Sequence, residues 1–573
     1  MRLCCLLRRN EVDPQSRLEN EATNNQSVEN DIEKFGLYQI MIFTFIGITL
    51  MLTAAFAFSY MFITSEVKYR CSVPECEHAE NTTFEPSWLN ASAPKINGVI
   101  SRCTRYVVQN DHLGTCTEAS FTNVTRDCDS WIYDPNEYTI LNEWGFTCDD
   151  NQWKLTLVST IQNIGQTVGL IFAGYISDRY GRRVVLTMAT ALSGVSGLIH
   201  SFSVNYYMFL VFQFLNAFIA AGIYDAGFIL GMEMMGVKNR IYGSIIISSM
   251  YAMGEILLGL FASWVRSWRM LLRIVYGPAL LAIFLPLVIP ESVRWLLSKD
   301  KHEEVNKIYH KMARMNGLQV TDETINTELD MIFVTMRLIF QKSELVVSDE
   351  RKPIVQVLHS SVILIRLLVC SFCWFTNGFI YYGMSLNSVS LAGDKYINFV
   401  LIAIVEIPAY YINCVLNNYI GRKPTLSGAF LLSGAFCLAS LFIPAGVWDY
   451  GFLFLYMAGK LCIAMAFSTM YLFTVELFPT TLRNSLLGIC DMMSRVGSSL
   501  SPQIPLLARI MPSLPLILFG SMSMIAGILS LIFPETLGMK LPDTVLEAEE
   551  IGKSNKTRKI PDLNTLPYQT NIR

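Results

Sequence analysis

A short loop signature that occurs twice, each time between two apolar runs, constrains the fold of this chain most. The first copy, Gly-Tyr-Ile-Ser-Asp-Arg-Tyr-Gly-Arg-Arg, occupies 174–183, and a shorter copy, Asn-Tyr-Ile-Gly-Arg-Lys, occupies 418–423. Two further patterns repeat at nearly the same offset: Glu233 and Arg240 with Glu476 and Arg483, and Pro290-Glu291-Ser292 with Pro534-Glu535-Thr536. Offsets of 240, 243 and 244 residues indicate an internal duplication, so the chain is expected to consist of two related halves.

Apolar runs of about 20 residues follow one another along the chain, and that length crosses a bilayer core as an α-helix. Only 16% of the residues are charged, against about a quarter in soluble proteins. The first run begins after 35 polar residues, so it is not expected to be a cleaved signal peptide. We expect an all-α membrane protein with twelve transmembrane helices in two six-helix pseudo-repeats, as in secondary transporters. The expected helices are 36–64, 154–175, 184–202, 205–233, 241–264, 267–290, 357–383, 396–418, 425–444, 450–475, 484–508 and 513–533.

The basic residues predict an orientation in the membrane. The short loops after helices 2, 4 and 8 contain Lys and Arg, whereas the loops after helices 3 and 9 contain neither. By the positive-inside rule, the basic loops and both termini are expected in the cytoplasm. A linker between the halves is expected to form short amphipathic helices, because Val305, Ile308, Tyr309 and Met312 recur with helical spacing. The expected segments are a cytoplasmic N-terminus (1–35), a first half (36–290), a cytoplasmic linker (291–356), a second half (357–534) and a cytoplasmic tail (535–573).

The long segment 65–153 between helices 1 and 2 is expected outside the cell. It contains glycosylation sequons at Asn81, Asn90 and Asn123. It also contains six of the 14 cysteines: Cys71, Cys76, Cys103, Cys116, Cys128 and Cys148. An even number of cysteines in an oxidising compartment predicts up to three disulfides, and the sequence leaves about fifteen pairings open. We therefore predict a large, glycosylated, disulfide-bonded extracellular loop.

The chain also lacks certain motifs. No Gly-x-x-x-x-Gly-Lys-Ser/Thr loop for ATP, no metal-ligand cluster and no hydrolytic triad is recognisable. We therefore expect a protein that is not an enzyme and has no cofactor or bound metal, and that uses solute gradients or exchange. The expected partners are a small solute and the lipid bilayer, with no nucleic acid. The sequence names neither a coupling ion nor an oligomeric state.

Several motifs resemble a known group of membrane proteins. Residues 174–183 resemble the loop signature of the major facilitator superfamily. The Cys-rich loop, the Pro-Glu-Ser-Val-Arg-Trp-Leu motif at 290–296 and the Glu-Leu-Phe-Pro-Thr-Thr-Leu-Arg-Asn motif at 476–484 together resemble its organic cation, carnitine and organic anion transporters. The resemblance covers about 36–550. It implies a plasma-membrane carrier that works by alternating access around a central site between the halves.

The resemblance gives the duplicated loops a role in gating. Asp178 is expected to cap the start of helix 11 and to pair with Arg240, which would close the cytoplasmic side. The alternative is that the arginines only set the topology. The second copy has Asn418 and Tyr419 in place of the acid and the arginine, which predicts a weaker second half of the gate. The full set of predicted gating residues is Asp178, Arg179, Gly181, Arg182, Arg183, Glu233, Arg240, Glu476 and Arg483.

Ionisable residues deep in the membrane are costly and indicate function. Six of them, four acids and two bases, lie well inside the expected helices: Asp225, Glu255, Glu406, Lys460, Asp491 and Arg495. Together they could hold both ends of a zwitterion. Asp225 is a departure from the carnitine carriers that this helix otherwise resembles. It could face an ammonium group or be held by a hydroxyl of helix 5.

Arg495 carries the most information about the substrate. In the family it resembles, the corresponding position is Asp in the cation carriers and Arg in the carnitine and organic anion carriers. A guanidinium matches a carboxylate bidentately, although Asp491, one turn away, could satisfy it internally. Glu406 and Lys460 match an acid and a lysine of the family, and the alternative is that they neutralise each other.

Aromatic residues on helix 7 add a second kind of contact. Trp374 and Tyr381 are seven residues apart and share a helix face, and Tyr224 on helix 4 could join them. Aromatic faces attract quaternary ammonium groups, with packing as the alternative. We therefore predict a secondary transporter of small organic zwitterions or cations of the carnitine type. The alternatives are an organic anion exchanger, a channel or receptor, and a non-transporting membrane scaffold.

Overall fold

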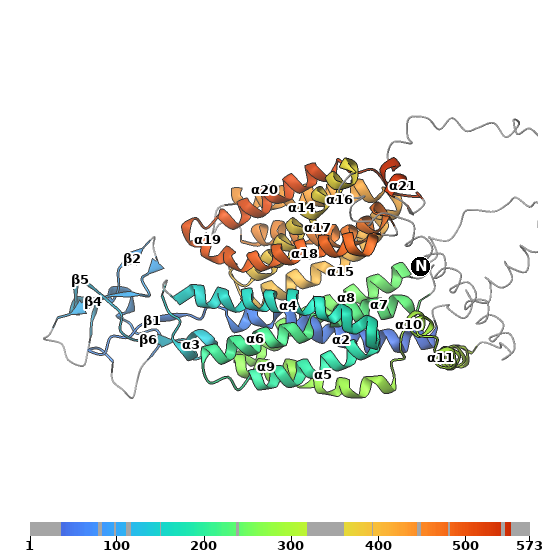
Figure 1. Cartoon of the computed structure of the whole chain (residues 1–573). Coiled ribbons are helices and arrows are strands. Elements are labelled where there is room, and N and C mark those ends of the chain that lie inside the picture. The colour runs from blue at the N-terminus through green and yellow to red at the C-terminus, as the bar shows by residue number, and fades with distance from the viewer. Residues whose placement is uncertain are drawn as a thin grey trace, which may run out of the picture.

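In the computed structural model the helices form two bundles that lie side by side, with a small β-rich segment at one end (Figure 1). Ten helices of the described part are long and apolar enough to cross a membrane. Helix α20 (Leu514–Ser530) is apolar but shorter, and α18 (Arg483–Leu500) carries three charged residues. These two helices complete the twelve expected spans. The residues described are 36–77, 83–96, 99–109, 116–148, 151–235, 240–317, 360–391, 393–443, 449–479, 482–539, 542 and 545–551.

The first bundle departs from uninterrupted helices in two places. The expected fourth span breaks at Ala221 and Gly222, and the sixth continues as a 3₁₀-helix that holds Pro278 and Pro286. Proline has no N–H to donate to the helix ladder, which explains the change of helix type. The elements of this bundle are α2 (Leu37–Ile63), α4 (Gln152–Tyr180), α5 (Arg182–His200), α6 (Tyr206–Ala220), α7 (Ile223–Glu233), α8 (Arg240–Val265), α9 (Trp268–Tyr276) and η5 (Pro278–Leu287).

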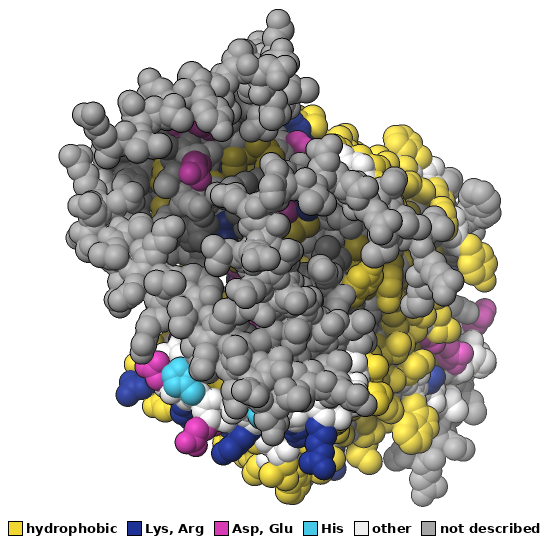
Figure 2. Space-filling view, turned by 90° about the vertical axis from the view of Figure 1, so that its right-hand side faces the viewer, with side chains coloured by type: hydrophobic (Ala, Val, Ile, Leu, Met, Phe, Trp, Pro, Cys, Tyr) yellow, Lys and Arg dark blue, Asp and Glu magenta, His cyan; other side chains and the backbone are white. Residues whose placement is uncertain are grey.

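The second bundle has one comparable break. The expected eleventh span is divided at Pro502 into α18, η7 (Ser501–Gln503) and α19 (Ile504–Ile510). Its other elements, besides α20, are α14 (Ser361–Ser388), α15 (Lys395–Tyr419), α16 (Arg422–Ala439), η6 (Ser440–Phe442) and α17 (Asp449–Leu477). Large apolar side chains are exposed on the flanks of both bundles, including Leu281, Phe284, Leu368 and Ile532, and Figure 2 shows such a hydrophobic flank. This surface suits a lipid environment.

The two loop signatures form equivalent turns, between α4 and α5 and between α15 and α16. Gly181 and Gly421 have φ of 108° and 111°, a conformation that glycine adopts readily. The Glu291 carboxylate accepts the backbone N–H groups of Arg182 and Arg183 at 2.9 and 3.0 Å. Glu535 does the same at the start of α16. The repeated Pro-Glu motifs therefore cap the helices that follow the repeated signatures.

The segment 65–153, called the cap below, holds three two-stranded antiparallel sheets. Strand β1 (Tyr69–Cys71) pairs with β6 (Trp131–Tyr133), β2 (Lys95–Ile96) with β3 (Val99–Ile100), and β4 (Thr104–Val108) with β5 (Phe121–Asp127). The cap also contains η1 (Leu89–Ala91), η2 (Glu118–Ser120) and α3 (Ile140–Trp144). Three disulfides are present, as predicted, and they join Cys71 to Cys128, Cys76 to Cys116 and Cys103 to Cys148.

Three short helices lie at the end of the bundles opposite the cap, called the signature end (Figure 1). They are α10 (Val293–Ser298), α11 (His302–Met315) and α21 (Val545–Glu550). Val305, Ile308, Tyr309 and Met312 of α11 are buried, as their helical spacing predicts. The rest of the expected linker, from 318 to 356, lies outside the described residues.

Candidate functional site

A cavity of about 160 Å³ lies between the bundles and is lined by both. It leads into a second cavity of about 800 Å³, and the two share Asp225, Phe228, Tyr410 and Tyr471 among their lining residues. The second cavity reaches Asp178, Arg182, Asn418 and Arg422 of the two loop signatures. In this conformation, therefore, the central cavity leads toward the signature end.

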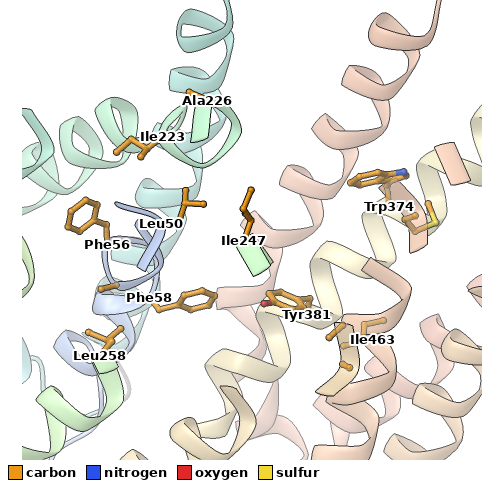
Figure 3. Packing of buried hydrophobic residues seen from close by; sticks show 14 of the residues in the cluster. Leu50, Phe56, Phe58, Ile223, Ala226, Ile247, Leu258, Trp374, Tyr381 and Ile463 are labelled. Carbon is orange, nitrogen blue, oxygen red and sulfur yellow. The ribbon is translucent and has the colours of Figure 1, made fainter. Parts of the chain in front are cut away.

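Aromatic packing separates the central cavity from the cap. Phe58 of α2 contacts Tyr382 of α14 and Phe399 of α15, with ring centroids 5.8 and 6.2 Å apart. One turn further, Phe62 packs on Phe399 at 5.0 Å and on Tyr396 at 5.5 Å. In Figure 3 the side chain of Phe58 points across the boundary toward the second bundle. These rings join the bundles at the cap end.

Polar contacts reinforce that closure, and the cap takes part in them. Glu137 of the cap forms an ion pair with Lys395 at 2.5 Å and accepts a hydrogen bond from the Tyr396 hydroxyl at 3.2 Å. Lys395 also donates to Ser65 Oγ at 3.1 Å. The Lys395–Glu137 pair, called the latch below, links the first half to the start of α15.

Aromatic side chains form much of the wall of the central cavity. Tyr381 and Tyr224 are among them, as predicted, whereas Trp374 is fully buried behind the wall. The Trp374 ring packs on Tyr471 at 4.6 Å, and its N–H donates to Thr474 Oγ1 at 3.0 Å, which is a packing role. The aromatic lining residues are Phe56, Tyr224, Phe228, Tyr251, Tyr276, Tyr381, Tyr382, Tyr410, Phe467 and Tyr471.

Three of the predicted charged residues come together at the cavities. Arg495 lines the central cavity and pairs with Asp491 of the second cavity, with Nε and Oδ2 3.7 Å apart. The Tyr471 hydroxyl lies 3.5 Å from Asp491 Oδ1. Asp225 lines both cavities in the first turn of α7 and interacts electrostatically with both residues. The internal pair of Arg495 with Asp491 is therefore present, and the guanidinium still faces the cavity.

The other three predicted charges lie behind the cavity wall. Lys460 Nζ is 2.9 Å from Glu406 Oε1, and both side chains are completely buried. Lys460 also donates to the Tyr381 carbonyl and to Ser385 Oγ. Glu255 is 1% exposed and lines neither cavity. Lys460 and Glu406 thus pair with each other inside the packed helices, as in the alternative drawn from the sequence.

Polar residues that the sequence analysis did not single out line the first-half side of the central cavity. They are the amides Gln162 and Gln166 on α4 and Gln213 and Asn216 on α6. Gln162 donates to the Ala57 carbonyl at 2.7 Å and accepts from Gln213. Their presence as uncharged amides inside apolar spans was the feature of the sequence that could have identified them. They give the cavity donors and acceptors opposite the aromatic wall.

The predicted gating residues are ordered by local contacts at the signature end. Asp178 is 80% exposed and pairs with Arg182, one turn along, at 3.4 Å. The side chain of Arg240 lies outside the described residues. Glu233 accepts from Ser292, and Arg179 donates to the Tyr175 hydroxyl.

The second copy is also held by contacts of its own. Glu476 forms an ion pair with Arg422 at 3.2 Å and accepts from Thr536 Oγ1 at 2.6 Å. Arg483 begins α18. In the first copy, Arg183 lies in the first turn of α5 and donates its backbone N–H to Glu291. The weaker second half expected from Asn418 stays a prediction.

Sequence and fold comparisons agree with this architecture. The family described as "Sugar (and other) transporter" matches residues 96–544. The organic cation/carnitine transporter 2 of Mus musculus is 32% identical over 531 residues, which cover 89% of this chain and 91% of the relative. The chain belongs to the organic cation and carnitine transporter family of the major facilitator superfamily. It is a multi-pass membrane transporter and not an enzyme.

Other relatives extend the comparison. The "Organic cation transporter protein" of Drosophila melanogaster is 29% identical over 524 residues, covering 91% of this chain and 93% of the relative. Among solved structures, a partially occluded inward-open conformation of the xylose transporter XylE from E. coli has a TM-score of 0.57 at 16% identity. It covers 88% of this chain and 100% of that one, which establishes the shared fold.

Proposed function

We propose that this protein transports small organic zwitterions or cations of the carnitine type across the plasma membrane by alternating access. The observation that carries the proposal is the combination of Arg495 with aromatic faces and acids around one cavity between the bundles. The names of the relatives from mouse and fly, which refer to organic cations and carnitine, favour the same class.

The cavity offers complementary groups for both ends of such a solute. Arg495 is the group that would hold a carboxylate, and its Nε makes no hydrogen bond within the described residues. A quaternary ammonium group would lie against the tyrosine faces, near Asp225 and Asp491. When a carboxylate arrives, Asp491 can give up its 3.7 Å contact with Arg495 and face the cation instead. An organic anion would use Arg495 alone, which is the alternative.

Alternating access fits the way the two ends differ. The cap end is closed by rings and the latch, and the signature end is open to the larger cavity. With the cap outside the cell and both termini in the cytoplasm, this conformation faces inward. Return to the outward-facing conformation would break the latch and bring the two signature loops together.

The test is uptake of radiolabelled carnitine, a tetraalkylammonium and a simple organic anion into expressing cells, with and without sodium. We expect carnitine-like uptake that falls about 10- to 150-fold in Arg495→Lys, because Lys keeps the charge but loses bidentate geometry worth about 1.5–3 kcal/mol. Arg314→Lys, on the exposed face of α11, is the matched control.

Three other results would each point elsewhere. Preferred uptake of the organic anion, lost equally in Arg495→Lys, would establish the anion exchanger instead. Preferred uptake of the bare cation, unchanged in Arg495→Lys, would refute the role of Arg495. Surface-expressed protein that moves none of the three solutes would favour a scaffold.

A further inference from the structure

Glu255, on α8, is a buried acid for which the substrate cavity gives no role. Its side chain is 1% exposed, and its Oε1 atom has no hydrogen-bond partner within the described part of the chain. An ionised carboxylate in such a place has lost its water and gained little in return. The position therefore demands an additional positive partner.

The groups around Glu255 do not supply enough positive charge. Glu255 interacts with Glu406 of α15, Lys460 of α17 and Tyr381 of α14. Tyr251 on its own helix, Tyr382 of α14 and Tyr410 of α15 also interact with it electrostatically. Lys460 is the one cation among these groups, and it is already 2.9 Å from Glu406. Two carboxylates thus share a single ammonium group, which leaves one negative charge without compensation.

The packing selects the kind of partner. A sodium ion needs a cage of several oxygen ligands, but Glu255 borders neither of the two cavities between the bundles. A proton occupies no volume and turns the carboxylate into a neutral hydrogen-bond donor. It is the cation that this site can accept.

A route for the proton leads from the cavity to the acids. The side chains of Tyr381 and Tyr410 line the central cavity and donate hydrogen bonds to Glu406 Oε2, at 2.6 and 3.1 Å. Tyr381 also interacts electrostatically with Glu255. One proton taken from cavity water can thus reach the pair of acids through the tyrosine hydroxyls, and it neutralises one carboxylate on arrival.

We propose that Glu255, together with Glu406 and Lys460, forms a proton-binding site that couples protonation to the relative movement of the two bundles. Glu255 belongs to the first bundle, and Glu406 and Lys460 to the second. Protonation permits the close approach seen here. Loss of the proton places two carboxylates side by side across the boundary and favours separation. Acidic conditions therefore stabilise the described conformation, and the coupling ion is H⁺.

Infrared difference spectroscopy of the purified full-length protein tests the site itself. We expect a protonated carboxylic acid C=O band that titrates with pH in the wild type and in the surface control Glu304→Gln, and that is lost in Glu255→Gln. A wild-type spectrum without such a band between pH 5 and 8 would overturn the proposal, and this comparison needs no variant. A band that persists in folded Glu255→Gln would overturn it as well.

Coupling to transport, which rests on the proposed function, is measured separately. Carnitine uptake by the wild type and by Glu304→Gln should change by up to about tenfold per unit of imposed pH gradient, the limit for one proton. Glu255→Gln should respond to the carnitine gradient alone. Uptake by the wild type that is indifferent to the pH gradient would refute the coupling. If no organic ion is transported but the infrared band titrates as expected, the proposed function fails and the proton site stands.

Discussion

The latch between the cap and α15 can be removed by a single substitution, Lys395→Met. The two side chains are only 15% and 19% exposed, so water screens their interaction weakly. Glu137 also keeps a hydrogen bond from Tyr396 at 3.2 Å. Hydrogen bonds between charged groups stabilise by about 1.5–3 kcal/mol. Since the latch exists only while the cap end is closed, its loss should raise the population open at that end by about 10- to 150-fold.

A cysteine below the Phe58 rings reports on that population. Ala57 lines the central cavity, so Ala57→Cys can be reached from the cap side only when the cap end opens. Cys414 lines the second cavity and is first changed to Ser so that it does not react. In this background, an impermeant thiol reagent applied to intact cells should label Ala57→Cys about 10- to 150-fold faster when Lys395→Met is added. Lys301→Met removes a half-exposed surface pair with Glu304 and is the control. Glu137→Gln should act like Lys395→Met, and the double variant should add little.

An unchanged labelling rate in folded, surface-expressed Lys395→Met would refute the latch. A faster rate in Lys301→Met as well would show that any surface charge change has the same effect, and the structural reasoning would fail.

Three further predictions concern the cap, the signature turn and the gate. In the cap, Asn90 and Asn123 are exposed, and Asn81 lies outside the described residues. Changing all three to Gln should abolish the gel shift that glycosidase treatment produces. A remaining shift would contradict the placement of the glycans. Gly181→Ala places a Cβ 2.2 Å from Glu291 Oε2 at a φ of 108°, so it should lower the stability of the protein by about 1–3 kcal/mol in thermal unfolding. Gly174→Ala, where the Cβ meets open space, should leave the stability unchanged. In the described conformation Asp178→Ala removes only an exposed ion pair, but it should weaken the opposite conformation, in which the signature end is closed. A shift of about 1–3 kcal/mol between the two conformations should lower the labelling rate of Ala57→Cys severalfold or more. Unaltered labelling would count against the gate.

The sequence was informative wherever a property is local. Span length, the repeated glycines and the paired cysteines could be predicted, because each depends on a short stretch of chain. The choice among fifteen cysteine pairings could not, because it depends on how distant strands of the cap meet. The break at Ala221–Gly222 was also missed, since both residues occur in apolar helices.

Depth in the membrane could be predicted, but rotation about a helix axis could not. Lys460 and Arg495 both lie well inside their helices, yet only Arg495 faces the central cavity. Trp374 and Tyr381 share a helix face in projection, but Trp374 is covered by Tyr471 of α17. These outcomes depend on which neighbouring helix packs against each face, and a single sequence does not contain that information.

The position of Glu137 has a consequence for molecules that never enter the cavity. Two disulfides, at Cys128 and Cys148, bracket the short stretch that carries it, so the cap holds this carboxylate at a fixed place above α15. An antibody fragment or a toxin that binds the cap and the start of α15 together would hold these two elements in contact. It would hold the carrier in the conformation described here, with the cap end closed, without entering the central cavity.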